Sequence, residues 1–176
     1  MKRSLKLLLV FVALFSVSPT HAKPAESPWD RLQFLIGDWV GAEGVYGVSG
    51  SHQYISFHFV GSQKKAIVQN THAEYPAVLG QAASVQYGLM MIYQDPVTQK
   101  VRADYKDSLG NVLRYTAEIS SDKEAVTLIS EADALGHHFR TTYFKRQDGA
   151  LGIKTMMAEP GSGDFNLMNE GAAYKK

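Results

Sequence analysis

Polar and aromatic side chains alternate along residues 51–60, and this is the first stretch of the chain whose residue types could do chemistry. On an extended strand one face carries His52, Tyr54, Ser56 and His58, and the other carries Gln53, Ile55, Phe57 and Phe59. If the polar face lines an enclosed space, Tyr54 and His58 could orient a polar group of a ligand. If the aromatic face lines it, the histidines lie in solvent. His52 and His58 would be roughly 20 Å apart along the strand, too far to share a metal ion.

Two arginines lie in the middle of expected strands, Arg114 in 111–119 and Arg140 in 137–146. A planar guanidinium that points into a cavity can hold a carboxylate through two hydrogen bonds. The face opposite Arg114 is strongly apolar, so we expect Arg114 to point outward. For Arg140 both orientations remain open, because Phe144 shares its face while aromatic and Thr side chains occupy the other.

Motifs of catalysis and of metal binding do not occur in the sequence. The chain has no Cys, and it contains no Gly-x-Ser-x-Gly, phosphate loop, dinucleotide fingerprint or zinc-helix motif. His137 and His138 are adjacent and therefore point to opposite faces of a regular strand. We assign no catalytic residue and no metal ligand, and we expect a binding protein more readily than an enzyme.

The first 22 residues, MKRSLKLLLVFVALFSVSPTHA, combine a basic start, an apolar run and a small residue at the end. This pattern predicts a signal peptide over 1–22, a flexible leader over 23–27 and a periplasmic or extracellular protein. The apolar run is shorter than the roughly 20 residues of a spanning helix, so we expect no stable membrane insertion. The remaining chain has 15 basic and 17 acidic residues, or 15 − 17 = −2, and no basic run that would indicate nucleic-acid binding.

The rest of the chain, residues 28–176, reads as one all-β domain. Ser27-Pro28 predicts the start of a short helix over 28–36, since Ser caps helices and Pro suits their first position. Period-two alternation between Gly-, Asp- and Pro-containing turns predicts ten strands, at 38–47, 51–60, 64–74, 85–94, 99–107, 111–119, 124–131, 137–146, 150–158 and 164–175. Closure removes the exposed edges of such a sheet, so we expect a single antiparallel up-and-down barrel.

The order of a short helix, then Gly37-Asp38-Trp39, then about ten strands resembles the calycin barrels: lipocalins, fatty-acid-binding proteins, avidins and nitrobindins. The resemblance implies that Trp39 closes one end of the barrel and packs against a basic residue of the last strand, here Lys175. Gly37, Trp39 and Lys175 would then form a structural seam. The stretch Leu35 to Gly44 is similar to the nitrobindin pattern Leu-x-Gly-x-Trp-x-Gly-x-Gly. Residues 91–95 and 105–110 look more like the related uncharacterised exported bacterial domains.

The nitrobindin resemblance would also imply haem, which those proteins hold through a histidine early in the final strand. The corresponding position here is near Asn169, and no histidine follows His138. Because a neutral Asn is a poor axial ligand beside imidazole, we disfavour haem and expect no cofactor.

These observations predict an exported barrel that reversibly binds a small apolar or amphipathic molecule. Large adaptable side chains expected to face inward are Phe57, Tyr87, Leu89, Met91, Tyr115 and Met156. The candidate ligand-binding residues are Tyr54, His58, Tyr87, Met91, Tyr115 and Arg140. The alternatives are an isomerase or hydrolase working in the cavity, and a structural or interaction module with a filled barrel. The sequence does not identify the ligand or the oligomeric state. Which face of 51–60 lines the barrel interior would help to distinguish these functions.

Overall fold

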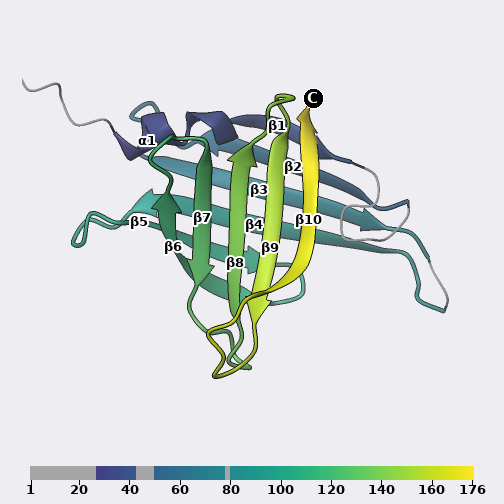
Figure 1. Ribbon diagram of the computed structural model, residues 1–176. Helices are drawn as coiled ribbons and strands as arrows, with labels where there is room; N and C mark the ends of the chain where they lie inside the picture. The colour runs from purple at the N-terminus through teal and green to yellow at the C-terminus, as the bar shows by residue number, and fades with distance from the viewer. Residues whose placement is uncertain (1–26, 43–49, 78–79) are drawn as a thin grey trace, which may run out of the picture.

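The computed structural model describes residues 27–42, 50–77 and 80–176, and it shows a closed antiparallel barrel (Figure 1). Neighbouring strands follow the chain order from β2 to β10, and β1 closes the ring by pairing with both β2 and β10. The strands are β1 Gly37–Gly41, β2 His52–Phe59, β3 Ala66–Tyr75, β4 Ser84–Gln94, β5 Val101–Asp107, β6 Val112–Ile119, β7 Ala125–Ser130, β8 His138–Lys145, β9 Leu151–Ala158 and β10 Asn166–Lys175. The predicted fold class, an up-and-down barrel of ten strands after a short helix, is confirmed.

Local turn chemistry explains why the strand limits were predictable. From β2 to β10 each observed end lies within two residues of its predicted position. β1 ends at Gly41, and most of the remainder of the predicted strand 38–47 lies outside the described residues. The signal peptide over 1–22 and most of the leader over 23–27 also lie outside them.

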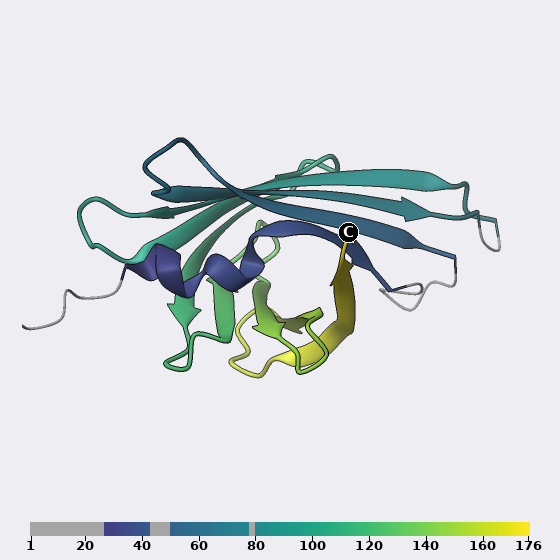
Figure 2. The ribbon, with the colours of Figure 1, turned by 90° about the horizontal axis from the view of Figure 1, so that it is seen from above.

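The predicted helix over 28–36 consists of two short pieces, α1 Pro28–Arg31 and the 3₁₀ turn η1 Gln33–Leu35. The Ser27 hydroxyl accepts a hydrogen bond from the Trp29 amide at 3.3 Å, as expected of a cap. Leu32, at φ −95° and ψ 2°, joins the two pieces and breaks the regular helix. The pieces lie across one end of the barrel (Figure 2), where Trp29, Leu32 and Leu35 are buried.

Alternating burial along the strands divides the side chains into an inner and an outer set. In β2 the inner set is Gln53, Ile55 and Phe57, which are all buried. The aromatic face of 51–60 therefore lines the barrel, and His52 and His58 are exposed. This settles the orientation that the sequence left open.

The barrel interior near α1 and η1 is a packed apolar core. Its best buried side chains, each less than 2% exposed, include Phe57, Ile67, Ile92, Leu128 and Leu151. Full burial of one such side chain contributes roughly 1.5–3 kcal/mol, so this half of the barrel supplies much of the stability.

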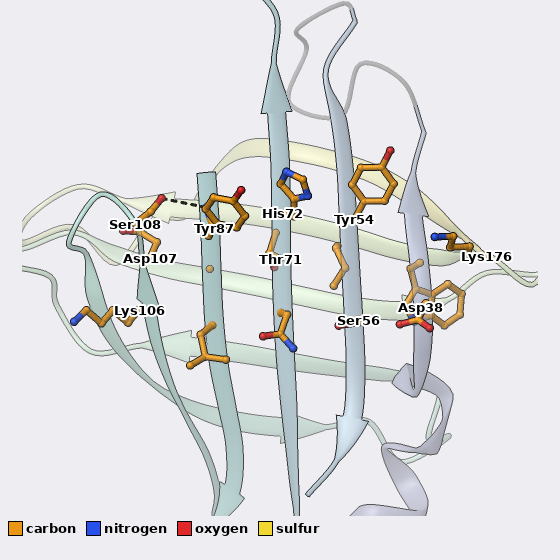
Figure 3. A pocket seen from close by; sticks show the side chains of 15 residues that line it. Asp38, Tyr54, Ser56, Thr71, His72, Tyr87, Lys106, Asp107, Ser108 and Lys176 are labelled. Carbon is orange, nitrogen blue, oxygen red and sulfur yellow. Dashed lines mark hydrogen bonds between the residues drawn. The ribbon is translucent and has the colours of Figure 1, made fainter. Parts of the chain in front are cut away.

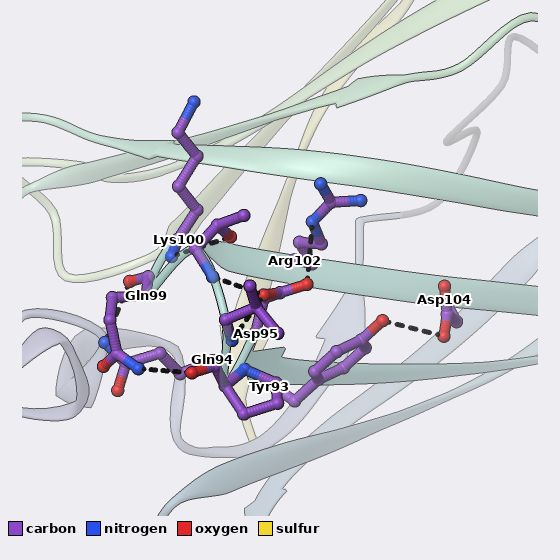
Figure 4. A network of polar contacts seen from close by, with 10 residues as sticks. Tyr93, Gln94, Asp95, Gln99, Lys100, Arg102 and Asp104 are labelled. Carbon is purple, nitrogen blue, oxygen red and sulfur yellow. Dashed lines mark hydrogen bonds and ion pairs between the residues drawn. The ribbon is translucent and has the colours of Figure 1, made fainter.

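The β4–β5 hairpin is held by a network of polar contacts around Asp95 (Figure 4). One Asp95 carboxylate oxygen accepts from the backbone amides of Val97 and Thr98 at 2.9 and 2.7 Å. The other lies 3.5 Å from the Arg102 guanidinium on β5. A carboxylate that caps its own turn in this way fixes the connection between the two strands.

Candidate functional site: the barrel cavity

A cavity of about 180 Å³ lies inside the half of the barrel away from α1 and η1. Inward positions of seven strands line it: Gln53, Ile55, Gln69, Thr71, Met90, Tyr105, Leu113, Tyr115, Phe139, Thr141, Tyr143, Ile153 and Thr155. The interior is thus packed at one end and hollow at the other. The lining mixes aliphatic and aromatic walls with hydroxyl and amide groups, and it includes no Asp, Glu, Lys, Arg or His.

Gln69 is the most informative polar group of the lining. The residue is 4% exposed, and its Nε2 donates to the Thr71 hydroxyl at 3.0 Å and to the Tyr143 hydroxyl at 3.2 Å. Its Oε1 is buried and has no hydrogen-bond partner among the described residues. One end of the amide is therefore fixed by two hydroxyls while the other end remains unsatisfied, which is costly for a buried polar group.

Tyr115 is the one predicted ligand-binding residue that lies in the cavity lining. Burial raises the pKa of its phenol well above the ordinary value, and the neighbouring Tyr105 and Asp107 act in the same direction. The phenol consequently stays protonated at neutral pH. It can serve as a hydrogen-bonding group but not as a general base.

The other predicted ligand-binding residues point away from the cavity. Tyr54, His58, Tyr87 and Met91 are exposed on the outer face of β2 and β4, and Arg140 is half-buried on the outer face of β8. The Arg140 guanidinium lies 4.0 Å from the centre of the Phe165 ring, so it does not offer a carboxylate grip inside the barrel. Arg114 is exposed, as expected.

The set of large side chains expected to face inward therefore needs correction. Phe57 and Tyr115 are buried in the barrel, but Tyr87, Leu89 and Met91 are exposed and Met156 shares the outer set of β9. The error has a physical reason in β4, where apolar residues occupy both faces. Met90 and Ile92 are the inner residues, and the outer row of apolar side chains carries no period-two signal to separate it.

A second hollow, of about 730 Å³, lies on the outer face of β1 to β5 (Figure 3). Its centre is a row of rings from three neighbouring strands, because Tyr54 pairs with His72 and His72 pairs with Tyr87. The ring centres are 5.6 Å apart for Tyr54 and His72 and 5.0 Å apart for His72 and Tyr87. Two of the predicted residues, Tyr54 and Tyr87, thus come together here rather than inside the barrel.

Polar contacts on this outer face are between neighbours within the sheet. His72 lies 3.3 Å from Glu74, and His58 lies 3.1 Å from Asp38. The ring pairs and the His58–Asp38 contact join neighbouring strands, and cross-strand pairs of this kind stabilise a sheet without any ligand. The outer hollow therefore has an explanation in the fold itself.

The structural seam has a definite geometry. Trp39 is 4% exposed, its indole N–H donates to the Leu35 carbonyl at 2.8 Å, and the Lys175 ammonium lies 5.4 Å from its ring centre. Trp39 and Lys175 are opposite each other in the β1–β10 pairing. Gly37 has φ 141°, and a Cβ added there would lie 3.1 Å from Lys175 Cε, so glycine is needed at this point.

Sequence reasoning missed the polar residues of the cavity, chiefly Gln69, Thr71, Thr141 and Thr155. The available signal was weak. Gln69 is two residues from Ile67 along β3 and therefore lies on the same, inward face of the strand. Glutamine and threonine are mostly found at the surface, and a single sequence does not show where they line an enclosed space.

In the described part of the chain no group of three His, Asp or Glu side chains could hold a metal ion. Within the same residues no helix is long and apolar enough to span a membrane. Comparison of the sequence with protein-family models and with curated proteins gave no match.

Proposed function

We propose that this protein reversibly binds a small amphipathic molecule inside its barrel. The observation that carries the proposal is the cavity, whose walls are apolar and whose lining presents an unsatisfied end of a buried amide. Binding pockets typically combine apolar walls with a few polar groups that orient the ligand.

The size of the cavity limits the ligand. Pockets for drug-sized ligands measure about 300–1,000 Å³, whereas this cavity measures about 180 Å³. An engineered apolar cavity of about 150 Å³ binds benzene. The ligand, or the part of it inside the barrel, is therefore about the size of one ring.

The resemblance to calycin barrels, which include many carriers, supports the same proposal as an analogy of fold. The finer resemblance to nitrobindins does not lead us to propose haem as the ligand. No histidine lines the cavity, the cavity is far too small for a porphyrin, and Asn169 occupies the position near which the ligating histidine would be expected. The signal-peptide pattern supports a periplasmic or extracellular location for the proposed carrier.

An enzyme working in this cavity has less support. The lining contains no carboxylate, imidazole or amine, and its tyrosines would have to supply any proton transfer. Since the pKa of Tyr115 is raised by burial, this phenol cannot act as a base near neutral pH.

Native mass spectrometry of protein purified from its host, together with displacement of an environment-sensitive apolar dye, tests the proposal. We expect a small-molecule adduct and saturable dye binding. Thr141→Leu, which narrows the cavity from β8, should weaken binding. Tyr87→Ala is the matched control, because it removes a ring from the outer hollow and should leave dye binding unchanged.

Circular dichroism checks that both variants are folded. The proposal fails if no adduct appears and the dye does not bind, or if folded Thr141→Leu binds the dye as well as the parent protein. Loss of binding in Tyr87→Ala alone would move the site to the outer face of the barrel.

A further inference from the structure

We propose that the ligand is electrically neutral and carries a hydroxyl group that hydrogen bonds to Gln69. This inference rests on the proposed function, because it names the chemistry of the molecule that occupies the same cavity. It goes beyond that function by excluding carboxylates, the ligands that fatty-acid-binding barrels hold with an inward arginine.

The charges around the cavity carry the first step. No side chain of the lining is formally charged at neutral pH, and Arg140 and Arg114 both point outward. The carboxylate of Asp107 lies near enough to the lining to act on Tyr115. A buried carboxylate needs a paired cation or several hydrogen-bond donors. In this cavity it would find no cation and would meet a like charge instead.

The orientation of the Gln69 amide carries the second step. Two hydroxyls, those of Thr71 and Tyr143, fix one end of the amide, and hydroxyls can either donate or accept. The opposite end is buried and unsatisfied in the described structure. A hydroxyl on the ligand satisfies that end whether it presents oxygen or nitrogen, because a hydroxyl also plays both parts.

The walls carry the third step. Ile55, Met90, Leu113, Phe139 and Ile153 provide the apolar surface of the cavity. A ligand that buries an apolar body against them while bonding Gln69 through one hydroxyl leaves no charged group to be desolvated. Small neutral alcohols and phenols fit this description, and ions of either sign do not.

A series of ligands that share one ring tests the inference: toluene, benzyl alcohol, benzoate and benzylamine. Dissociation constants are measured by dye displacement at neutral pH. An unsatisfied buried partner typically costs 1–3 kcal/mol, so benzyl alcohol should bind roughly 5- to 150-fold more tightly than toluene. Benzoate and benzylamine should bind more weakly than benzyl alcohol.

Gln69→Met supplies the matched variant, because it keeps a side chain of similar length without an amide. The preference for benzyl alcohol over toluene should disappear in Gln69→Met and persist in Gln86→Leu. Gln86 also lies in the inward set of a strand, but it does not line the cavity. In the parent protein the NMR signals of the Gln69 side-chain amide should shift with benzyl alcohol and much less with toluene. This measurement tests the inference even if Gln69→Met does not fold.

The outcomes separate the two proposals. If none of the four ligands binds and the dye does not bind, the proposed function fails. If toluene binds as tightly as benzyl alcohol, or if benzoate or benzylamine binds most tightly, the cavity binds ligands but the inference about a neutral hydroxyl is wrong. An unchanged Gln69 amide signal at saturating benzyl alcohol contradicts the inference in the same way.

Discussion

At the scale of single residues, Trp39 shows how one side chain joins three parts of the molecule. Its ring is buried, its indole N–H bonds the carbonyl of Leu35 at the end of η1, and Lys175 of β10 lies over its face. The helix pieces, the first strand and the last strand all meet at this ring. Its loss would open the junction as well as leave a cavity.

Trp39→Ala is therefore expected to lower the free energy of unfolding by about 3–5 kcal/mol, the usual cost of deleting a large buried aromatic side chain. Trp39→Phe should cost less, because it keeps most of the packing and loses the hydrogen bond to Leu35. Urea denaturation of the parent protein, Trp39→Ala and Trp39→Phe measures the order of their unfolding free energies. An unchanged unfolding midpoint in Trp39→Ala would show that the ring does not hold the barrel closed.

The sequence indicated Trp39 and Lys175 through the resemblance to calycins, but it did not indicate Gln69. The difference is physical. Gly-x-Trp is a local pattern at a fixed place in the fold, whereas the role of Gln69 depends on which side chains meet it across the barrel. Tyr143, its hydrogen-bond partner, is 74 positions away along the chain, and no local spacing predicts that contact.

At the scale of elements, the hairpin between β4 and β5 depends on a titrating group. Backbone hydrogen bonds, first from Thr98, hold the pKa of the Asp95 carboxyl below its ordinary value of 3.8. A carboxyl whose pKa is lower in the folded than in the unfolded state stabilises the fold above the unfolded-state pKa. This stabilisation disappears as the pH falls through the folded-state pKa.

Asp95→Asn is accordingly expected to destabilise the protein at neutral pH and to matter progressively less as the pH falls below 3.8. The Asn side chain can still accept hydrogen bonds in the turn, so the lost contribution is that of the charge. Chemical denaturation of both proteins over a series of pH values measures the difference in unfolding free energy. A difference that stays constant down to the lowest pH would contradict the proposed role of ionised Asp95.

Strand β4 shows which part of an element a single sequence leaves undetermined. Its limits were predicted to within one residue, because turn residues flank it on both sides. Its orientation was assigned incorrectly, because apolar side chains occur at both parities. Gly88 lies on the inner face, where a Cβ would come within 2.9 Å of the Tyr105 side chain. The residues on either side of Gly88 therefore face outward.

At the scale of the whole molecule, the barrel divides into a packed half and a hollow half. The α1 and η1 pieces seal the packed half with buried Trp29, Leu32 and Leu35. In the hollow half, Thr, Gln and Tyr occupy several inward positions beside the aliphatic residues. The packed end thus contributes most to stability, and the hollow end is the proposed binding site. Substitutions at the two ends should therefore change the free energy of unfolding in opposite directions.

Thr141→Leu in the hollow half is expected to raise the free energy of unfolding by about 1 kcal/mol, since each added buried methylene contributes about 0.8 kcal/mol. The Thr141 hydroxyl gives up little, because its nearest polar partner is the Thr155 hydroxyl at 3.5 Å. Phe57→Ala in the packed half should instead lower the free energy by about 3–5 kcal/mol. Thermal and urea unfolding of the ligand-free proteins measure both changes. If Thr141→Leu destabilises the protein as strongly as Phe57→Ala does, the interior near Thr141 is as tightly packed as the core, and a cavity that can admit a ligand is ruled out.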